Sequence, residues 1–202
     1  MTDLQSVLER CVARGDAPFL VAMTGNAAGT TFSGAAGEAA PGRPAAEDTV
    51  FRIFSMTKAV GSVAAMMMIE RGKLSMDTPV AEVLPAFRDI KVLDGWNGDE
   101  PVLRAPRTEC TIRHLATHTS GFCYEFWNPD VPRWMEKTGH PTIVSGMKAA
   151  LNYPLAFDPG SRWDYGIGID WLGQAVEAVD GRRIDAFVTE EILQPLGMTS
   201  SG

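Results

Sequence analysis

The sequence predicts an α/β (α+β) protein, in which a lobe of strands and helices carries a mainly helical insertion. Two observations lead to this expectation. Runs of β-branched and aromatic residues, typical of strands, lie in the first 54 residues, whereas helical periodicity dominates the rest. In addition, a long and almost wholly apolar helix is expected over 55–71, directly after the last of these runs. We therefore expect that helix to be buried beside the strands.

Four elements are expected before that helix. Apolar residues at helical spacing predict the first, which Gly15 can end, and runs rich in Val, Thr and Phe predict three strands. In chain order they are a helix over 4–12 and strands over 19–24, 30–37 and 49–54. Turn residues between the first two strands predict a hairpin, and a loop rich in alanine, proline and glycine precedes the third, which we expect to be short and buried.

After Gly72 the sequence predicts short elements. They are a short helix after Val80, β segments over 90–93 and 102–104 around a turn, and helices over 111–118, 144–151, 166–179 and 184–193. Residues 121–141 hold three prolines, and we expect them to be irregular.

Composition excludes several classes of protein. A chain of 202 residues with 45% hydrophobic and 21% charged residues can bury one sizeable core. Its net charge of -7 argues against a nucleic-acid partner, and no apolar run reaches the ~18 residues of a membrane helix. The N-terminus lacks a secretion signal, which favours the cytoplasm. Cys11, Cys110 and Cys123 are expected to be free, buried thiols.

Ser55 and Lys58 are the strongest candidates for chemistry. They would lie at the start of the apolar helix, three residues apart and on one face of its first turn. A lysine there opposes the helix dipole and loses hydration, so we expect its pKa to be lowered. A neutral amine beside a hydroxyl can take its proton and leave a nucleophilic serine, as in the Ser-x-x-Lys arrangement of acyl-transfer enzymes.

A second match to the same spacing, Ser145 to Lys148, is discounted because it follows a loop with proline and begins only a short helix. His114 and His118 are four residues apart, but no third ligand is evident, so we interpret them as packing residues and expect neither metal nor cofactor. Tyr165 follows a Pro-Gly turn at a helix entry. It is either an ordinary core tyrosine or a phenol that exchanges protons with a lysine.

Four segments, in this order, resemble the serine β-lactamase-like superfamily of class C β-lactamases, DD-peptidases and family VIII carboxylesterases. The segments are Ser55-Met56-Thr57-Lys58, the run from Ile112 to Phe122, Pro159-Gly160 with Tyr165-Gly166, and Pro195-Leu196-Gly197-Met198. The resemblance implies an antiparallel sheet flanked by helices, with a helical insertion lobe. It divides the chain into an α/β lobe (1–75), the insertion lobe (76–165) and helices returning to the first lobe (166–202).

The resemblance also implies residue roles. Ser55 would be acylated, Lys58 and Tyr165 would share its proton, and the Ser55 N–H would be one oxyanion donor. Phe122, Tyr124, Trp127 and Ile167 are expected to contact the substrate, with core packing as the competing interpretation for the aromatic residues. The superfamily's third motif, which supplies the second oxyanion donor, has no match here, so we expect a C-terminal remainder or a second chain to complete the site.

The resulting hypothesis is a serine hydrolase that cleaves small-molecule esters of small or medium acyl groups. An ester is favoured over a lactam because Ile167 stands where lactamases and peptidases carry asparagine. Two alternatives remain open. One is a β-lactamase, DD-peptidase, amide hydrolase or acyltransferase on the same trio, and the other is a sensor that is acylated without turnover, or an inactive fragment.

Overall fold

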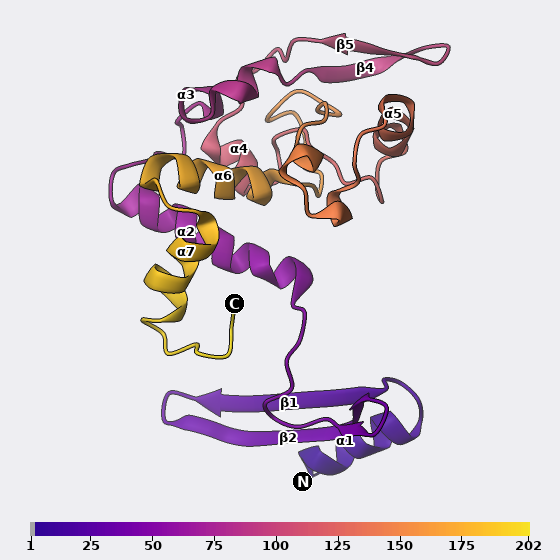
Figure 1. The fold of residues 1–202 in the computed structure, drawn as a ribbon, viewed down its shortest axis with the longest axis vertical. Coiled ribbons are helices and arrows are strands. Elements are labelled where there is room, and N and C mark those ends of the chain that lie inside the picture. The colour runs from indigo at the N-terminus through magenta and orange to yellow at the C-terminus, as the bar shows by residue number, and fades with distance from the viewer. Residues whose placement is uncertain (1–2) are drawn as a thin grey trace. The chain divides into compact units, whose positions relative to one another are not determined.

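The computed structural model describes residues 3–202, which divide into two compact units after Ile53. In the first unit, helix α1 (Leu4–Ala13) packs against an antiparallel hairpin of β1 (Phe19–Asn26) and β2 (Gly29–Ala40), and the short β3 (Arg43–Pro44) pairs with the end of β2 (Figure 1). The carboxylate of Asp3 caps α1 by accepting from the N–H groups of Gln5 and Ser6. The predicted helix and first two strands are confirmed.

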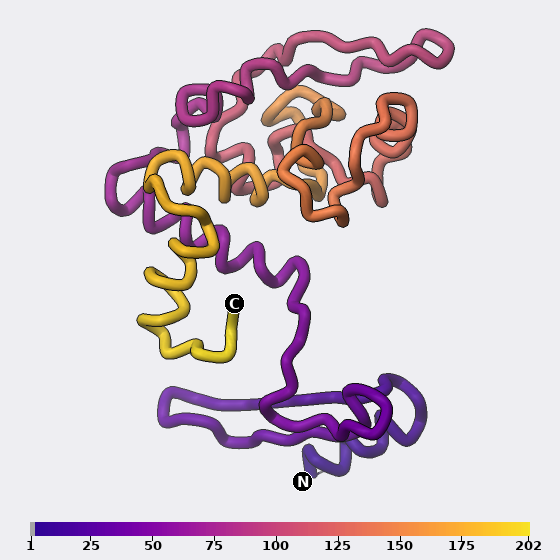
Figure 2. The backbone as a smooth tube through the Cα atoms, in the orientation of Figure 1, coloured from indigo at the N-terminus to yellow at the C-terminus, as the bar shows by residue number. Residues whose placement is uncertain are grey.

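The third predicted strand, over 49–54, is wrong. Residues 50–53 form no strand, and Val50 and Ile53 are 79% and 46% exposed. Figure 2 shows the segment as an extended stretch of chain. A strand is held by hydrogen bonds to a neighbouring strand, and this segment pairs with none within residues 3–202. Thr49 exchanges two hydrogen bonds with Ala46, and the ring of Phe51 stacks on Phe19 at 5.5 Å between centroids.

The second unit is mainly helical. Its elements are α2 (Thr57–Glu70), α3 (Val80–Val83), β4 (Val92–Asn97), β5 (Glu100–Arg104), α4 (Ile112–Ala116), α5 (Asp130–Thr138), α6 (Gly168–Asp180) and α7 (Ile184–Val188). β4 and β5 form an antiparallel hairpin, which confirms two β segments around a turn, but β4 continues to Asn97 through residues that were predicted as the turn. The helix predicted over 144–151 is instead two 3₁₀ turns, Ile143–Ser145 and Lys148–Leu151, because Gly146 between them takes φ +68°.

Helix α2 packs against α6 to form the centre of the core (Figure 1). Its residues Ala64, Ala65 and Met68 are fully buried, but Val63 and Met66 on another face are 48% and 40% exposed. Within the described residues the helix is therefore buried on the face that meets α6 and partly exposed on another. The three-part division at 75 and 165 stays a prediction.

Helix α5 lies in the stretch expected to be irregular. Pro129 precedes the helix and Pro132 falls in its first turn, where a missing N–H breaks no helical hydrogen bond. All three cysteines are free, as predicted, although Cys11 is only half-buried. None of the helices within residues 3–202 is long and apolar enough to cross a bilayer.

Candidate active site

Ser55 lies in a 3₁₀ turn, Phe54–Met56, that leads directly into α2. The residue before it, Phe54, has φ +45°, in the left-handed region that non-glycine residues rarely adopt. Such backbone strain is found preferentially at functional sites. The turn leaves the Ser55 side chain exposed at the beginning of the helix.

The amine of Lys58 connects Ser55 to two tyrosines. Its Nζ donates to Ser55 Oγ at 3.4 Å and to the hydroxyl of Tyr124 at 3.0 Å. The same Nζ lies 5.3 Å from the centroid of the Tyr124 ring and 5.1 Å from that of Tyr165. The structure thus brings the predicted trio of Ser55, Lys58 and Tyr165 together and adds Tyr124 as a second phenol.

The pKa of Lys58 is raised, which corrects the expectation of a lowered value. Burial pushes that pKa down, but the hydrogen bond and charge of Tyr124, together with Tyr165 and the carboxylate of Asp170, more than offset it. Burial raises the pKa of Tyr124, against the opposing effect of its hydrogen bond with Lys58. At neutral pH the resting pair is therefore an ammonium and a phenol.

A close backbone approach places the two tyrosines beside each other. The N–H of Tyr124 donates to the carbonyl of Tyr165 at 3.1 Å, and their ring centroids are 5.3 Å apart. A side chain at Gly166 would overlap the carbonyl oxygen of Phe122, so only glycine allows this approach. Tyr124 lies 66 residues from Lys58 in the sequence, so no local spacing identifies it as a second phenol of the site.

The two histidines have separate environments. His114 caps its own helix, because its Nδ1 accepts from the N–H of Thr111 at 3.1 Å. His118, at φ +56°, packs its ring 4.8 Å from that of Tyr165. Burial, and then the charge of Lys58, lower the pKa of His118, so its ring is neutral beside Tyr165 at pH 7. Within residues 3–202, no three His, Cys, Asp or Glu side chains are grouped to hold a metal ion.

Comparison with known proteins assigns the family, because the beta-lactamase family model matches residues 4–202. The chain belongs to the beta-lactamase family. Its structural neighbours have the β-lactamase/transpeptidase fold expected from the sequence, here as helices combined with antiparallel strands.

Related proteins include both esterases and acyltransferases. The chain is 35% identical over 162 residues to the lovastatin esterase of Penicillium rubens, covering 79% of this chain and 41% of the esterase. It is 36% identical over 159 residues to the monacolin J acid methylbutanoyltransferase of Aspergillus terreus, covering 77% of this chain and 38% of the transferase. The solved structure of unliganded simvastatin synthase (LovD) from Aspergillus terreus matches with a TM-score of 0.84 and 29% identity, over 98% of this chain and 54% of that one. The chain thus spans about two fifths of the length of these curated relatives and about half of the solved structure.

In this beta-lactamase family member, the four residues expected to contact substrate fall into two groups. Phe122 and Ile167 lie in the core at 1% and 0% exposure, so within the described residues neither offers a surface to a substrate. Phe122 packs against aromatic side chains, which is the competing interpretation given above. Tyr124 is largely buried but contacts Lys58, and Trp127 is 69% exposed. Trp127 therefore remains a candidate for substrate contact.

The second Ser-x-x-Lys match of this family member has no comparable geometry. Ser145 Oγ accepts from the N–H of Met147 at 3.3 Å, and the amine of Lys148 forms a 2.6 Å ion pair with Glu177. The Lys148 amine is thus directed at Glu177, and its only side-chain hydrogen bond among the described residues goes to that carboxylate rather than to Ser145. The geometry supports the choice of Ser55.

A salt-bridge clamp holds the loop that leads to Tyr165. Arg104 donates to both carboxylate oxygens of Asp158, at 2.7 and 2.8 Å, and Asp158 also accepts from the N–H of Arg107 at 2.8 Å. These donors lower the pKa of Asp158 to about 2. The clamp ties the loop just before the Pro-Gly turn to the β4–β5 hairpin.

The clamp predicts acid sensitivity. Because the folded pKa of Asp158 is depressed, its contribution to stability is complete above pH ~4 and is lost as the pH falls towards about 2. We expect Arg104→Gln to lose this contribution and to unfold at a higher pH on acidification, as followed by circular dichroism. The control is Arg113→Gln, whose partner Asp77 is 78% exposed in its side chain. An equal shift in both variants would contradict a specific role for the clamp.

Proposed function

We propose that the intact protein is a serine carboxylesterase, which cleaves esters of small or medium acyl groups through an acyl-Ser55 intermediate. One observation carries the proposal: a single amine, Lys58 Nζ, reaches Ser55 Oγ at 3.4 Å and the Tyr124 hydroxyl at 3.0 Å. A hydroxyl, an amine and a phenol in hydrogen-bond sequence can move one proton away from the nucleophile and back.

The mechanism follows from this arrangement. Once the Lys58, Tyr124 and Tyr165 group has lost a proton, it accepts the proton of Ser55 as Oγ attacks the ester carbonyl carbon. The group then gives that proton to the departing alcohol oxygen, which leaves acyl-Ser55 and a free alcohol. A water molecule next attacks the acyl carbon, loses its proton to the same group, and releases the carboxylic acid as Ser55 Oγ is reprotonated. The Ser55 N–H, at the start of α2, is the proposed donor to the oxyanion of both steps.

The rate should rise with pH. Since the pKa of Lys58 lies above its ordinary value and that of Tyr124 is also raised, fewer than about one molecule in a thousand has lost the required proton at pH 7. The reactive form then increases about tenfold for each pH unit. We expect log kcat/KM for an activated ester to rise with a slope near one from pH 7 to 9. A profile already flat above pH 6 would contradict a raised pKa for Lys58.

An ester, rather than a lactam, is favoured by position 167. Lactamases and peptidases of the superfamily carry an asparagine there, which contacts the substrate amide, whereas this chain has a fully buried isoleucine. An apolar, inaccessible side chain cannot supply that polar contact. The similarity to a lovastatin esterase points the same way.

Acyl transfer is the second candidate, favoured by the similarity to a methylbutanoyltransferase. Exposed aromatic side chains near the phenols, Phe126 and Trp163 at 59% and 64% exposure, offer an apolar surface to an organic alcohol. Transfer and hydrolysis share acyl-Ser55 and differ in whether an alcohol or water takes the acyl group. Adding alcohol acceptors during ester cleavage, and measuring new ester against free acid, distinguishes the two.

Turnover tests the proposal itself. A short-chain p-nitrophenyl ester should release many equivalents of p-nitrophenol for each equivalent of intact protein. A single stoichiometric burst would indicate a sensor that is acylated without release, and no release at all would indicate an inert site.

A further inference from the structure

A cavity of about 380 Å³ opens beside Lys58. It lies between α2, α6, the two 3₁₀ turns at 143–151 and the start of α7. The volume falls in the usual range of small-molecule sites. Lys58 lines the cavity, and its amine lies 3.4 Å from Ser55 Oγ. The Lys58 side chain therefore links the cavity to the proposed nucleophile.

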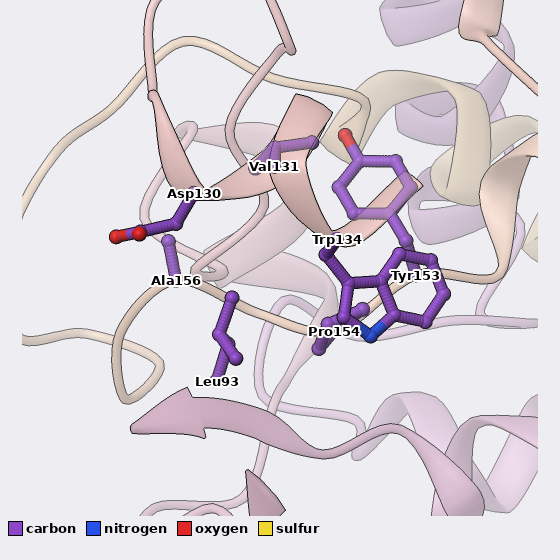
Figure 3. A pocket seen from close by; sticks show the side chains of 7 residues that line it. All are labelled: Leu93, Asp130, Val131, Trp134, Tyr153, Pro154 and Ala156. Atoms are coloured by element: carbon purple, nitrogen blue, oxygen red, sulfur yellow. The ribbon is translucent and has the colours of Figure 1, made fainter. Parts of the chain in front are cut away.

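A second cavity, lined in part by Tyr153, is too small for a substrate. Figure 3 shows the side chains that line it, with the Asp130 carboxylate pointing away from the rings of Trp134 and Tyr153. Its volume of about 20 Å³ holds a single water molecule. It has no lining residue in common with the Lys58 cavity.

The walls of the Lys58 cavity suit an aliphatic chain. Most of their exposed surface is apolar, and the polar residues of the lining are Thr57, Lys58, Lys148, Asp170 and Gln174. The apolar lining includes Phe54, Met147, Leu151, Ile169 and Ile184. Lys148, which also lines the cavity, is neutralised by its ion pair with Glu177. At about 30 Å³ for each methylene-sized group, the share of a water molecule in the liquid, an eight-carbon chain needs roughly 240 Å³.

The positions of the phenols indicate which half of an ester, the acyl group or the alcohol, enters the Lys58 cavity. The departing alcohol must take its proton from the lysine–tyrosine group, and the phenols lie against Phe126 and His118 rather than in the cavity lining. The alcohol is therefore assigned to the tyrosine side of Lys58, which leaves the cavity that Lys58 lines for the acyl group.

We propose that this cavity is the acyl pocket and that it accepts aliphatic acyl groups of up to about eight carbons. The proposal rests on the esterase function proposed above and names its substrate class.

Gly173 of α6 sets the depth of the pocket. It is buried in the wall, and a Cβ built on it would lie 3.8 Å from Cγ1 of Ile184, in ordinary contact with no overlap. A larger side chain there would project into the cavity without striking the backbone. Leucine also favours a helix more than glycine does, so Gly173→Leu should keep the fold.

The experiment compares kcat/KM of the intact protein and its variants on p-nitrophenyl esters from acetate to octanoate. We expect the unaltered protein to prefer butyrate to octanoate over acetate. Gly173→Leu should lower the octanoate-to-acetate ratio by roughly tenfold or more. Leu151→Ala, which enlarges the pocket, should raise that ratio. Ala178→Leu adds the same side chain to an exposed position of α6 outside the lining, and it should leave the octanoate-to-acetate ratio unchanged.

The outcomes separate the two proposals. An unchanged ratio in both Gly173→Leu and Leu151→Ala overturns the acyl pocket and leaves the esterase function standing, since acetate is still cleaved. Absence of turnover on every ester, the unaltered protein included, overturns the proposed function and the pocket with it. If Gly173→Leu fails to fold, the direction of change in Leu151→Ala decides.

Discussion

Ser55→Ala is expected to abolish ester turnover, with a loss of about 10⁴-fold or more in kcat. The reason is that, in the proposed mechanism, the carbonyl carbon must bond to Oγ before the alcohol can leave. Within residues 3–202, the hydroxyls that accept a hydrogen bond from Lys58 are those of Ser55 and Tyr124. The Tyr124 hydroxyl does reach the amine, but it is the phenol of a largely buried side chain. The measurement is steady-state release of p-nitrophenol by the intact protein.

Ser145→Ala is the matched control, since it removes the serine of the only other Ser-x-x-Lys spacing in the sequence. We expect it to keep full turnover, because its lysine is held by Glu177. If Ser145→Ala is the inactive variant and Ser55→Ala retains activity, the assignment of the nucleophile is wrong.

Tyr124→Phe is expected to have the second largest effect, a fall of about 10²–10⁴-fold in kcat at high pH. The change removes the hydroxyl that lies 3.0 Å from Lys58 Nζ. That hydroxyl also raises the pKa of Lys58, so its loss lowers this pKa and moves the rising limb of the pH profile to lower pH. The measurement is kcat and kcat/KM from pH 6 to 10, with Tyr165→Phe compared in the same series.

Tyr153→Phe controls for the loss of a phenol from the same region. Its hydroxyl donates to the carbonyl of Cys123 at 2.7 Å and does not contact Lys58. Leaving a buried carbonyl unpaired costs about 1–3 kcal/mol of stability, but the pH profile should not move. A shift in Tyr153→Phe equal to that in Tyr124→Phe would show that the effect is structural and would remove Tyr124 from the proton path.

The local part of the site could be predicted from sequence, and the long-range part could not. Ser55 and Lys58 share one turn of one helix, so their spacing alone places them together. Tyr124 joins them only because the chain at Gly166 passes against Phe122, an approach that no local pattern specifies. The raised pKa of Lys58 was missed for the same reason. Two local effects, desolvation and the helix dipole, lower the pKa of Lys58. The phenols and Asp170, which raise this pKa, come from other segments of the chain.

The errors in the fold have a related cause. Residues 49–54 have strand composition, but a strand forms only where a partner strand pairs with it, and none does within residues 3–202. The expected substrate contacts of Phe122 and Ile167 came from the family resemblance, and the order of motifs does not tell which side chains pack into the core. Their burial follows from packing around α6, which only the folded chain determines.

Identification of the acylated residue tests the central claim most directly. The intact protein, quenched in acid during hydrolysis of p-nitrophenyl butyrate, would be digested and its peptides analysed by mass spectrometry. The account predicts one butyryl group on the peptide that contains Ser55, and none on the peptide that contains Ser145. A butyryl group at Ser145, or continuing turnover with no acylated peptide at all, would contradict it.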